Sequence, residues 1–399
     1  MISGTSAATA ARLMSEFARR TDLSPAGQNP RRYLWTDAFA VCNFLELFER
    51  TRDQQYRRLA TASVDQVHQV LGRYREDNAR RGWISGLDEA AARCHPVRGG
   101  LRIGKALKER GSEEAIDEQL EWDRDGQYFH YLTKWMHALC RMAFVTNGRQ
   151  YADWAGELAR IAFRAFVRRS GSGKVVGVYW KMSTDLSRPL LPAMGLHDAL
   201  DGFITFREVQ YAITKVSGDS GLNGLSREAE ALFALCRHRE WTTGDPLGVG
   251  GLLFDACRLC QLIGREQPRE LRLLQEVMQG CRNGLMVMFD LGYLKRPASQ
   301  RLAFRELGLA IGPRALPFIA QTAEKHKDTF GCNPPLLRII DLLLPYQSLS
   351  DEILRLWLPH AEHPDASWKA HQDINEVMLA TAMVPQTFLS VGERLQIGS

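Results

Sequence analysis

Tryptophan and aspartate residues recur together at points where an apolar helical pattern begins. Five segments share this arrangement: Trp35–Asp37, Trp122–Asp125, Trp180–Asp185, Trp241–Asp245 and Trp368–Asp373. An aromatic side chain beside a carboxylate suits a sugar, because the C–H faces of the sugar stack on the ring and its hydroxyl groups bond to charged acceptors. Each Asp could equally cap a helix, since its carboxylate accepts hydrogen bonds from free backbone N–H groups.

The densest group of such side chains spans residues 121–137, with the sequence EWDRDGQYFHYLTKWMH. Residues three or four apart share one face of a helix, so aromatic and basic side chains meet here on a helix with a core pattern. A buried Lys or His is costly unless it is paired or hydrated. We therefore predict that Tyr128, Tyr131 and Lys134 bind substrate and that His130 is a catalytic acid or base. A structural network of paired side chains is the alternative.

A second group lies in residues 179–188, a loop with an aromatic pair, two cations and a carboxylate. Pro189 is expected to begin the next helix, which would place Arg188 in its cap region. We predict that Asp185 is catalytic and that the neighbouring side chains bind substrate, namely Trp180, Lys181 and Arg188.

A third group, residues 371–376, contains His371, Asp373 and Glu376. The two carboxylates are three residues apart and would form one acidic edge. Asp373 is therefore a catalytic candidate, and His371 and Glu376 are substrate-binding candidates. A capping box, with Asp373 as the N-cap and Glu376 at the third helical position, explains the same spacing.

The segment 82–104 is too long for a simple connection, and such loops often act as lids or binding loops. It contains Trp83, which we expect to bind substrate, and the two arginines Arg98 and Arg102. These arginines could grip an anionic group such as a carboxylate or phosphate. Arginines that face solvent are the simpler explanation.

Helices must position these residues, because apolar residues recur with helical period and a strand pattern is confined to about residues 175–179. The pattern predicts helices in couples: 37–50 with 53–75, 127–145 with 150–168, 189–203 with 206–215 and 226–238, 250–263 with 268–289, 298–310 with 313–325, 335–344 with 350–358, and 371–383 with 7–20. The first helix of each couple is the more apolar, as a helix buried on all sides requires. We therefore predict an all-α fold of six or seven hairpins, with an inner and an outer ring, formed by residues 1–399 as one domain with a long entrance loop at about 76–125.

The composition limits the classes of partner that the chain is expected to bind. The 399 residues carry a net charge of +5 without a block of like charges, so we expect no nucleic-acid partner. No apolar run reaches the roughly 18 residues of a membrane span, and the first residues lack a signal-peptide pattern, so we expect no membrane association and a cytoplasmic location. Cys257 and Cys260 form a lone C-x-x-C within a helical pattern, so we expect neither a metal nor another cofactor. The oligomeric state stays open.

The hairpin number, the Trp–Asp segments and the sequence YFHYLTKWMHAL resemble the six-hairpin glycosidase superfamily, whose fold is the (α/α)6 toroid. The resemblance covers about residues 22–385. It implies a central cleft that binds a small saccharide. Because the superfamily also includes lyases and sugar epimerases, the resemblance narrows the substrate more than the reaction.

The main functional hypothesis is a glycoside hydrolase that acts through two carboxylates. The candidates for these carboxylates are Asp125, Asp185, Asp373 and Asp37. Trp35 and Trp241 are expected to contact the sugar. One alternative is a sugar epimerase, isomerase or lyase that uses His and Tyr for proton transfer, with His130, His371 and His95 as the candidate acids and bases. The other is a toroid that binds a glycan without catalysis.

Overall fold

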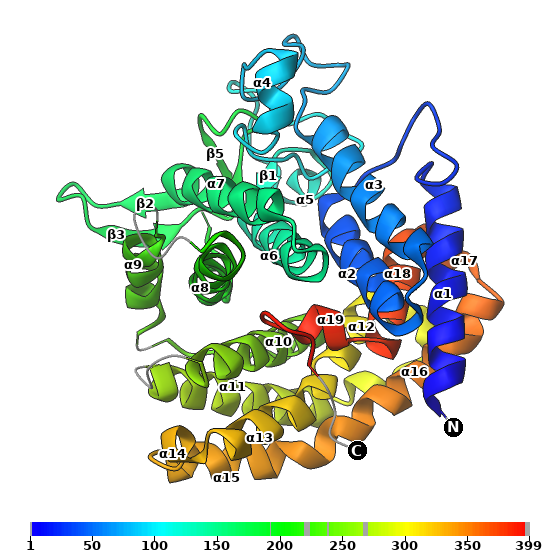
Figure 1. The fold of residues 1–399 in the computed structure, drawn as a ribbon, viewed down its shortest axis with the longest axis vertical. Coiled ribbons are helices and arrows are strands. Elements are labelled where there is room, and N and C mark those ends of the chain that lie inside the picture. The colour runs from blue at the N-terminus through cyan, green and yellow to red at the C-terminus, as the bar shows by residue number, and fades with distance from the viewer. Residues whose placement is uncertain (1, 192, 219–223, 238, 266–269, 396–399) are drawn as a thin grey trace. The chain divides into compact units, whose positions relative to one another are not determined.

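The computed structural model describes residues 2–191, 193–218, 224–237, 239–265 and 270–395. This part of the chain is mostly α-helical, with short strands between some of the helices (Figure 1). The prediction of an all-α chain with many helical hairpins is confirmed.

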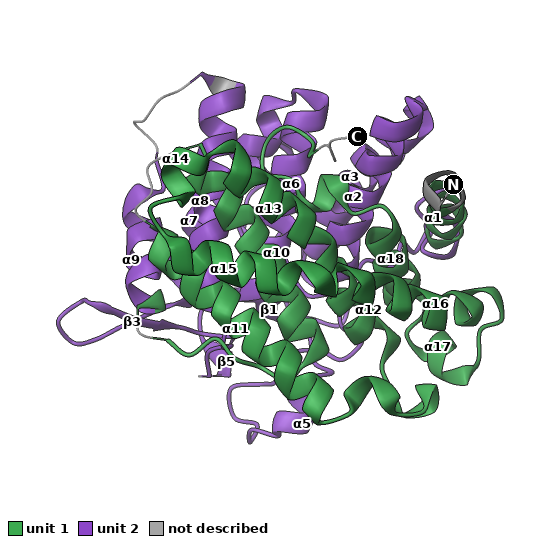
Figure 2. Cartoon of the chain, turned by 90° about the horizontal axis from the view of Figure 1, so that it is seen from below, with its two compact units in different colours: residues 1–17, 236–399 green, residues 18–235 purple. Residues whose placement is uncertain are grey.

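The chain divides into two compact units, which are coloured separately in Figure 2. Unit 2 comprises residues 18–235, and unit 1 comprises residues 1–17 and 236–399. Helix α1 (Ile2–Arg20) belongs to unit 1 as far as Phe17. The expectation that residues 1–399 form one domain stays a prediction.

Unit 2 is built on α2 (Leu34–Thr51), α6 (Phe129–Thr146) and α8 (Asp198–Ser217), with α6 packed between the other two (Figure 1). Helix α3 (Gln54–Leu71) covers α2, and α7 (Arg149–Phe166) covers α6 and α8. The central helices are buried on nearly every side, whereas α3 and α7 bury one face. This confirms the predicted division into more and less apolar helices in the first two couples.

Tight links join these couples because the helices end on left-handed residues. Arg52 closes α2 at φ 59° and Asn147 closes α6 at φ 53°. A left-handed residue reverses the chain direction and satisfies the last carbonyl groups of the helix. The predicted end of the helix 127–145 is confirmed to within one residue, because α6 ends at Thr146.

Two small antiparallel sheets also belong to unit 2. One has the order β1-β4-β5, formed by Gln127–Tyr128, Lys181–Met182 and Pro189–Leu191. The other pairs β2 (Val167–Arg169) with β3 (Val175–Val178), where the sequence indicated a strand. The remaining elements are α4 (Glu89–Cys94) and α5 (Glu118–Glu121) in the long loop, and α9 (Ser226–Cys236).

The predicted helix start at residue 189 and the predicted break at residues 204–205 are wrong, whereas residues 206–215 are helical as predicted. Residues 189–191 form the edge strand β5, where a proline costs no ladder hydrogen bond. Helix α8 then starts at Asp198 and continues through residues 204–205, which contain no Gly or Pro to stop it. Arg188 therefore precedes a strand and lies in no helix cap.

Unit 1 is built on α10 (Pro246–Ile263), α12 (Ala303–Ile311) and α18 (Gln372–Met383), with α12 packed between the other two. Helix α11 (Leu271–Asp290) packs on α10, and α16 (Leu349–Glu362) packs on α12 and α18. By length and composition α10 could cross a membrane, but 83% of it is buried, which is typical of a core helix.

Two of the predicted couples in unit 1 are wrong as packing partners, although their helices exist. Helix α13 (Leu316–Lys325) packs mainly on α10, and α15 (Pro334–Leu343) packs mainly on α11. Proline-containing 3-10 turns precede α13 and follow α15 and redirect the chain. The short elements of this unit are η2 (Tyr293–Lys295), η3 (Ala298–Gln300), η4 (Pro313–Ala315), η5 (Leu344–Ser348), α14 (Lys327–Phe330), α17 (Ala366–Ala370) and α19 (Gln386–Leu389).

Candidate functional site

Aromatic side chains gather in unit 2 where α2 and α6 begin. The ring of Trp35, in the first turn of α2, lies 5.3 Å from Tyr131 and 5.8 Å from His130, both in the first turn of α6. Tyr33 precedes α2, and its hydroxyl group shares a hydrogen bond of 2.6 Å with that of Tyr131. We call the following residues the aromatic cluster: Tyr33, Trp35, Trp122, Tyr128, His130, Tyr131 and Trp180.

The strand pair β1–β4 brings the second sequence group to the first. It places Tyr128 opposite Lys181, so the preceding residue, Trp180, reaches the start of α6. Trp180 stacks on Tyr128 at 5.3 Å and donates a hydrogen bond of 3.3 Å from Nε1 to Nδ1 of His130. Trp122 contacts the edge of Trp180 at 4.5 Å and is 50% exposed. Segments that are about 50 residues apart in sequence therefore form one cluster.

The rings of the cluster differ in exposure. Trp35, His130, Tyr131 and Trp180 are half-buried, so neighbouring side chains hold them while part of each ring stays accessible. Tyr128 is buried beneath them, and its hydroxyl group has no hydrogen-bond partner among the described residues. Rings that are held in place and partly accessible can stack on a ligand at a low cost in side-chain entropy.

His130 is neutral at physiological pH. Burial, and then the nearby Lys134 ammonium, lowers the pKa of His130 from 6.5 to about 3. Because Nδ1 accepts the hydrogen bond from Trp180, the remaining proton is assigned to Nε2, which is a donor. Burial also raises the pKa of Tyr131 well above its ordinary value, so its phenol stays protonated.

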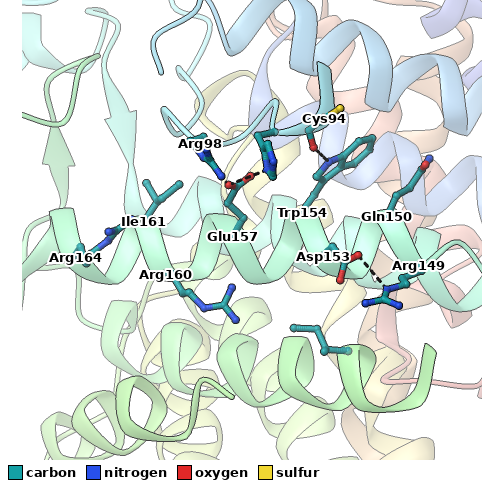
Figure 3. A pocket seen from close by; sticks show the side chains of 12 residues that line it. Cys94, Arg98, Arg149, Gln150, Asp153, Trp154, Glu157, Arg160, Ile161 and Arg164 are labelled. Atoms are coloured by element: carbon teal, nitrogen blue, oxygen red, sulfur yellow. Dashed lines mark hydrogen bonds and ion pairs between the residues drawn. The ribbon is translucent and has the colours of Figure 1, made fainter. Parts of the chain in front are cut away.

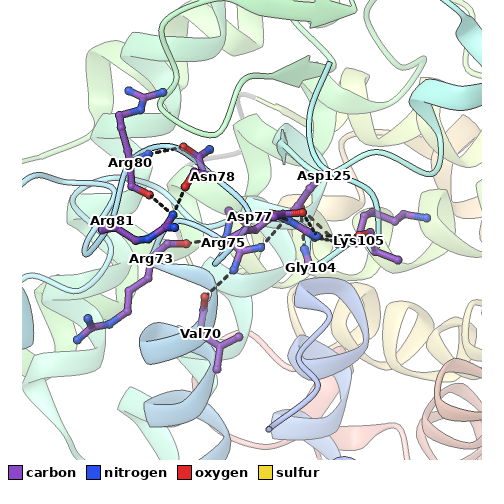
Figure 4. Close-up of polar contacts among 12 residues, drawn as sticks. Val70, Arg73, Arg75, Asp77, Asn78, Arg80, Arg81, Gly104, Lys105 and Asp125 are labelled. Atoms are coloured by element: carbon purple, nitrogen blue, oxygen red, sulfur yellow. Dashed lines mark hydrogen bonds and ion pairs between the residues drawn. The ribbon is translucent and has the colours of Figure 1, made fainter. Parts of the chain in front are cut away.

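Two of the predicted catalytic carboxylates are buried in ion pairs. Asp37 bonds to Arg32 at 2.9 Å and accepts the backbone N–H of Tyr33 at 2.8 Å. Asp125 is paired with Arg102 and anchors the loop at residues 104–105 (Figure 4). Both oxygen atoms of each carboxylate are thus occupied by groups of the chain itself. These contacts are those of structural ion pairs, and a catalytic role for either aspartate stays a prediction.

Asp185 is also stabilised in its ionised form. Partial burial alone would raise its pKa, but hydrogen bonds from Ser183, Ser187 and Arg80 outweigh burial and hold the pKa well below its ordinary value. An acid that stays ionised cannot donate a proton at neutral pH. The role of Asp185 as the general acid is thus disfavoured and stays a prediction.

The predicted lysines have buried partners. Lys181 lies 3.2 Å from Glu121 and also donates to two backbone carbonyl groups, and burial lowers its pKa. Lys134 lies 2.8 Å from Asp201 of α8. Asp201 was not among the predicted residues, although a carboxylate in an apolar helix signals a buried partner. The alternative of a structural network, which was given for residues 121–137, describes Lys134 well.

Two other predicted residues of unit 2 have local contacts. Trp83 is buried, donates from Nε1 to Glu89 at 3.0 Å and lies beneath the Arg73 guanidinium. Arg188 donates to the carbonyl group of Arg110. These contacts lie within the loops, and among the described residues Trp83 makes no ring contact with the aromatic cluster.

Four predicted residues belong to unit 1. Trp241 is 1% exposed and packs so closely on α11 that a Cβ at Gly280 would lie 2.5 Å from it. His371 is exposed and meets the ring edge of Phe304, and Asp373 is half-buried in the first turn of α18. Glu376 is buried and accepts a hydrogen bond of 2.8 Å from Gln372. The proposed capping box is wrong, because His371 is the N-cap and its side chain makes no cap hydrogen bond.

A groove of about 730 Å³ lies elsewhere in unit 2, along the outer face of α7 beside α4 (Figure 3). Its centre is Glu157, which bonds to Arg98 at 2.9 Å and to His95 at 3.2 Å. Arg98 and Arg102 therefore both pair with carboxylates of this chain. The expectation that these arginines face solvent holds for the exposed Arg98 and is wrong for Arg102, which is buried. Among the described residues no group of three or more His, Cys, Asp or Glu side chains could hold a metal ion.

Comparison with known proteins gives a likeness of fold. No family model and no curated protein matches the sequence. The GH76A α-1,6-mannanase from Salegentibacter sp. HEL1_6 superimposes with a TM-score of 0.50 at 12% identity, over 96% of this chain and 100% of that one. This chain has the (α/α)6 toroid fold. D-mannose isomerase also matches, with a TM-score of 0.45 at 12% identity over 85% of this chain and 86% of that one. The predicted resemblance to the six-hairpin superfamily is confirmed at the level of fold.

Proposed function

We propose that this chain is a carbohydrate-active enzyme that binds a saccharide against the aromatic cluster, with glycoside hydrolysis as its reaction. One observation carries the proposal: the half-buried rings of Trp35, Tyr131 and Trp180 surround a neutral His130 at the N-terminal ends of two core helices. Sugars bind to such walls through C–H contacts to the rings and hydrogen bonds to a few polar groups. The fold shared with a mannanase supports the same class of substrate.

Hydrolysis needs a protonated acid and a second carboxylate. Asp123 is exposed, follows Trp122 directly and forms no ion pair with a described residue, so we propose it as the carboxylate at the cluster. Asp373 belongs to unit 1 and stays a sequence prediction for a catalytic carboxylate. Asp123→Asn should abolish turnover but keep saccharide binding, because the change removes the ionisable carboxyl group and preserves the shape of the side chain.

The binding proposal is tested with Trp35→Ala and Trp180→Ala. Tryptophans at the centre of a binding site contribute about 2 kcal/mol or more, so the affinity for an α-1,6-linked manno-oligosaccharide should fall about 30-fold or more in calorimetry. Trp154→Ala is the matched control, because Trp154 lines the groove on α7 (Figure 3). Wild-type affinity in both cluster variants would contradict the proposal.

A sugar isomerase or epimerase is the second candidate, and the state of His130 favours it. A neutral imidazole with its proton on Nε2 can polarise a sugar carbonyl group by donating a hydrogen bond. Deuterium from heavy water would then enter the recovered sugar, whereas hydrolysis would release a new reducing end. His130→Gln should stop deuterium exchange, and Asp123→Asn should leave it intact.

A binding protein without catalysis is the remaining alternative from the sequence. Tight binding of the oligosaccharide in calorimetry, with neither product release nor deuterium exchange, would favour it. A cytoplasmic location is part of the proposal and follows from the sequence pattern. Fractionation of the source cells tests this location directly.

A further inference from the structure

We propose that the saccharide carries a carboxylate and that Lys105 binds this group, an inference that rests on the proposed function. The Lys105 ammonium lies over the face of Tyr33, 5.4 Å from the ring centroid. Tyr33 is itself bonded to Tyr131 within the aromatic cluster. A cation is thus fixed at the border of the wall that is proposed to hold the sugar.

Among the lysines near the aromatic cluster, Lys105 differs from Lys181 and Lys134 because its ammonium group lacks a carboxylate partner among the described residues. Lys181 is neutralised by Glu121, and Lys134 is neutralised by Asp201. Lys105 is half-buried, and its ammonium group forms no ion pair with any carboxylate of the described chain. The face of Tyr33 stabilises the cation only in part. A carboxylate on the ligand would complete a charge-assisted hydrogen bond that the protein itself does not supply.

The backbone of Lys105 is held by buried charges. Asp125 accepts the N–H of Gly104 at 3.0 Å and that of Lys105 at 3.3 Å, while Arg75 donates to the Lys105 carbonyl group. Gly104 has φ 92°, and a Cβ there would lie 2.2 Å from the carbonyl oxygen of Arg32. In Figure 4 the Lys105 side chain extends away from the Asp125 carboxylate that holds its backbone. A residue that is held in this way loses less entropy when it binds a ligand.

A carboxylate fits this site better than a phosphate. Planar arginine groups recognise phosphate with two parallel hydrogen bonds, but Arg75 and Arg102 are engaged with Asp125 and backbone carbonyl groups. Lys105 supplies one compact positive charge, which matches a monoanion. The substrate class is therefore a saccharide with a uronic acid residue, and Asp125 acts as a positioning residue for Lys105.

Paired ligands test the inference by calorimetry on the full chain. The probes are manno-oligosaccharides and the corresponding oligomannuronates. Oligosaccharides of glucose and of galactose are compared with their uronic acid counterparts in the same way. The wild type should prefer the acidic member of a pair by about tenfold or more at low salt, and added salt should reduce this preference. Lys105→Gln should remove the preference with little change for the neutral sugar, and Lys105→Arg should keep part of it.

Matched measurements separate the possible failures. Lys108→Gln removes an exposed charge from the same loop and should leave the preference unchanged, and melting curves establish that each variant folds. If neutral sugars bind and Trp180→Ala abolishes their binding, but acidic and neutral sugars bind the wild type equally, the inference is wrong and the proposed function stands. Tighter binding of mannose 6-phosphate or of inorganic phosphate would also overturn the assignment of a carboxylate. If no probe binds the wild type, both proposals are overturned.

Discussion

The same Trp–Asp pattern has different outcomes in the two units. In unit 1, Trp241 is 1% exposed and Asp245 is an ordinary N-cap that accepts the N–H of Gly248 at 2.9 Å. In unit 2, Trp122 is 50% exposed, and Asp125 is buried in an ion pair with Arg102 and caps no helix. Similar spacing thus gives a closed, structural junction in one unit and accessible rings in the other.

The elements that face each junction cause this difference. In unit 1, α11 presents Gly280 to Trp241, so the helix packs directly against the Cβ and backbone of this residue, which is 1% exposed. In unit 2, Trp122 meets another ring, Trp180, at its edge and keeps half of its surface accessible. Whether a tryptophan of this pattern is available to a ligand therefore depends on a neighbour that is distant in the sequence.

The largest expected effect is loss of stability in Trp241→Ala. Removing a fully buried indole ring costs about 3–5 kcal/mol, because it loses burial and leaves a cavity. Chemical denaturation measures this change in the free energy of unfolding. Trp122→Ala is the exposed counterpart and should stay within about 0.5 kcal/mol of the wild type. Equal losses in the two variants would remove the distinction between the junctions.

Asp125→Asn should cost about 3 kcal/mol, since it leaves the buried Arg102 without its charged partner. The matched change in unit 1, Asp245→Asn, should cost less than about 1 kcal/mol, because Asn is also a good N-cap and the ion pair with Arg305 is partly exposed. Chemical denaturation of both variants in the same buffer compares their losses of stability through the denaturant midpoints. A smaller cost at Asp125 than at Asp245 would contradict the assignment of Asp125 as a structural anchor.

A pH dependence that arises in unit 2 is the last expected difference between the units. Burial lowers the pKa of His68 and of His130 from 6.5 to about 3. Between these values the unfolded chain binds protons that the folded chain does not, so the free energy of unfolding falls as the pH drops from 6.5 towards 3. His130→Gln should reduce this slope in denaturation curves, whereas His371→Gln in unit 1 should not, because His371 is exposed. An unchanged slope in the His130 variant would show that its imidazole is already charged in the folded protein.

Most helices could be predicted because their signals are local. The end of α6 before Asn147 follows from the chemistry of single residues. The start of α10 was predicted too late, at residue 250, although Asp245 caps the helix and Pro246 begins it. The prediction failed at residues 189–203, where pairing with β4 gives Pro189 a strand environment that no local pattern reveals. The packing partners of α13 and α15 were also wrong, since short helices pack according to tertiary context.

By itself, the sequence determined the helical character of the chain, the apolar faces of its core helices and the clustering of aromatic residues near helix starts. Only the tertiary structure decided that Asp37, Asp125 and Asp185 each meet an arginine, and that Lys105 meets an aromatic ring instead of a carboxylate. The physical reason is that a helix depends on neighbours within a few residues. The charge state and accessibility of a side chain depend on whichever groups the fold brings beside it.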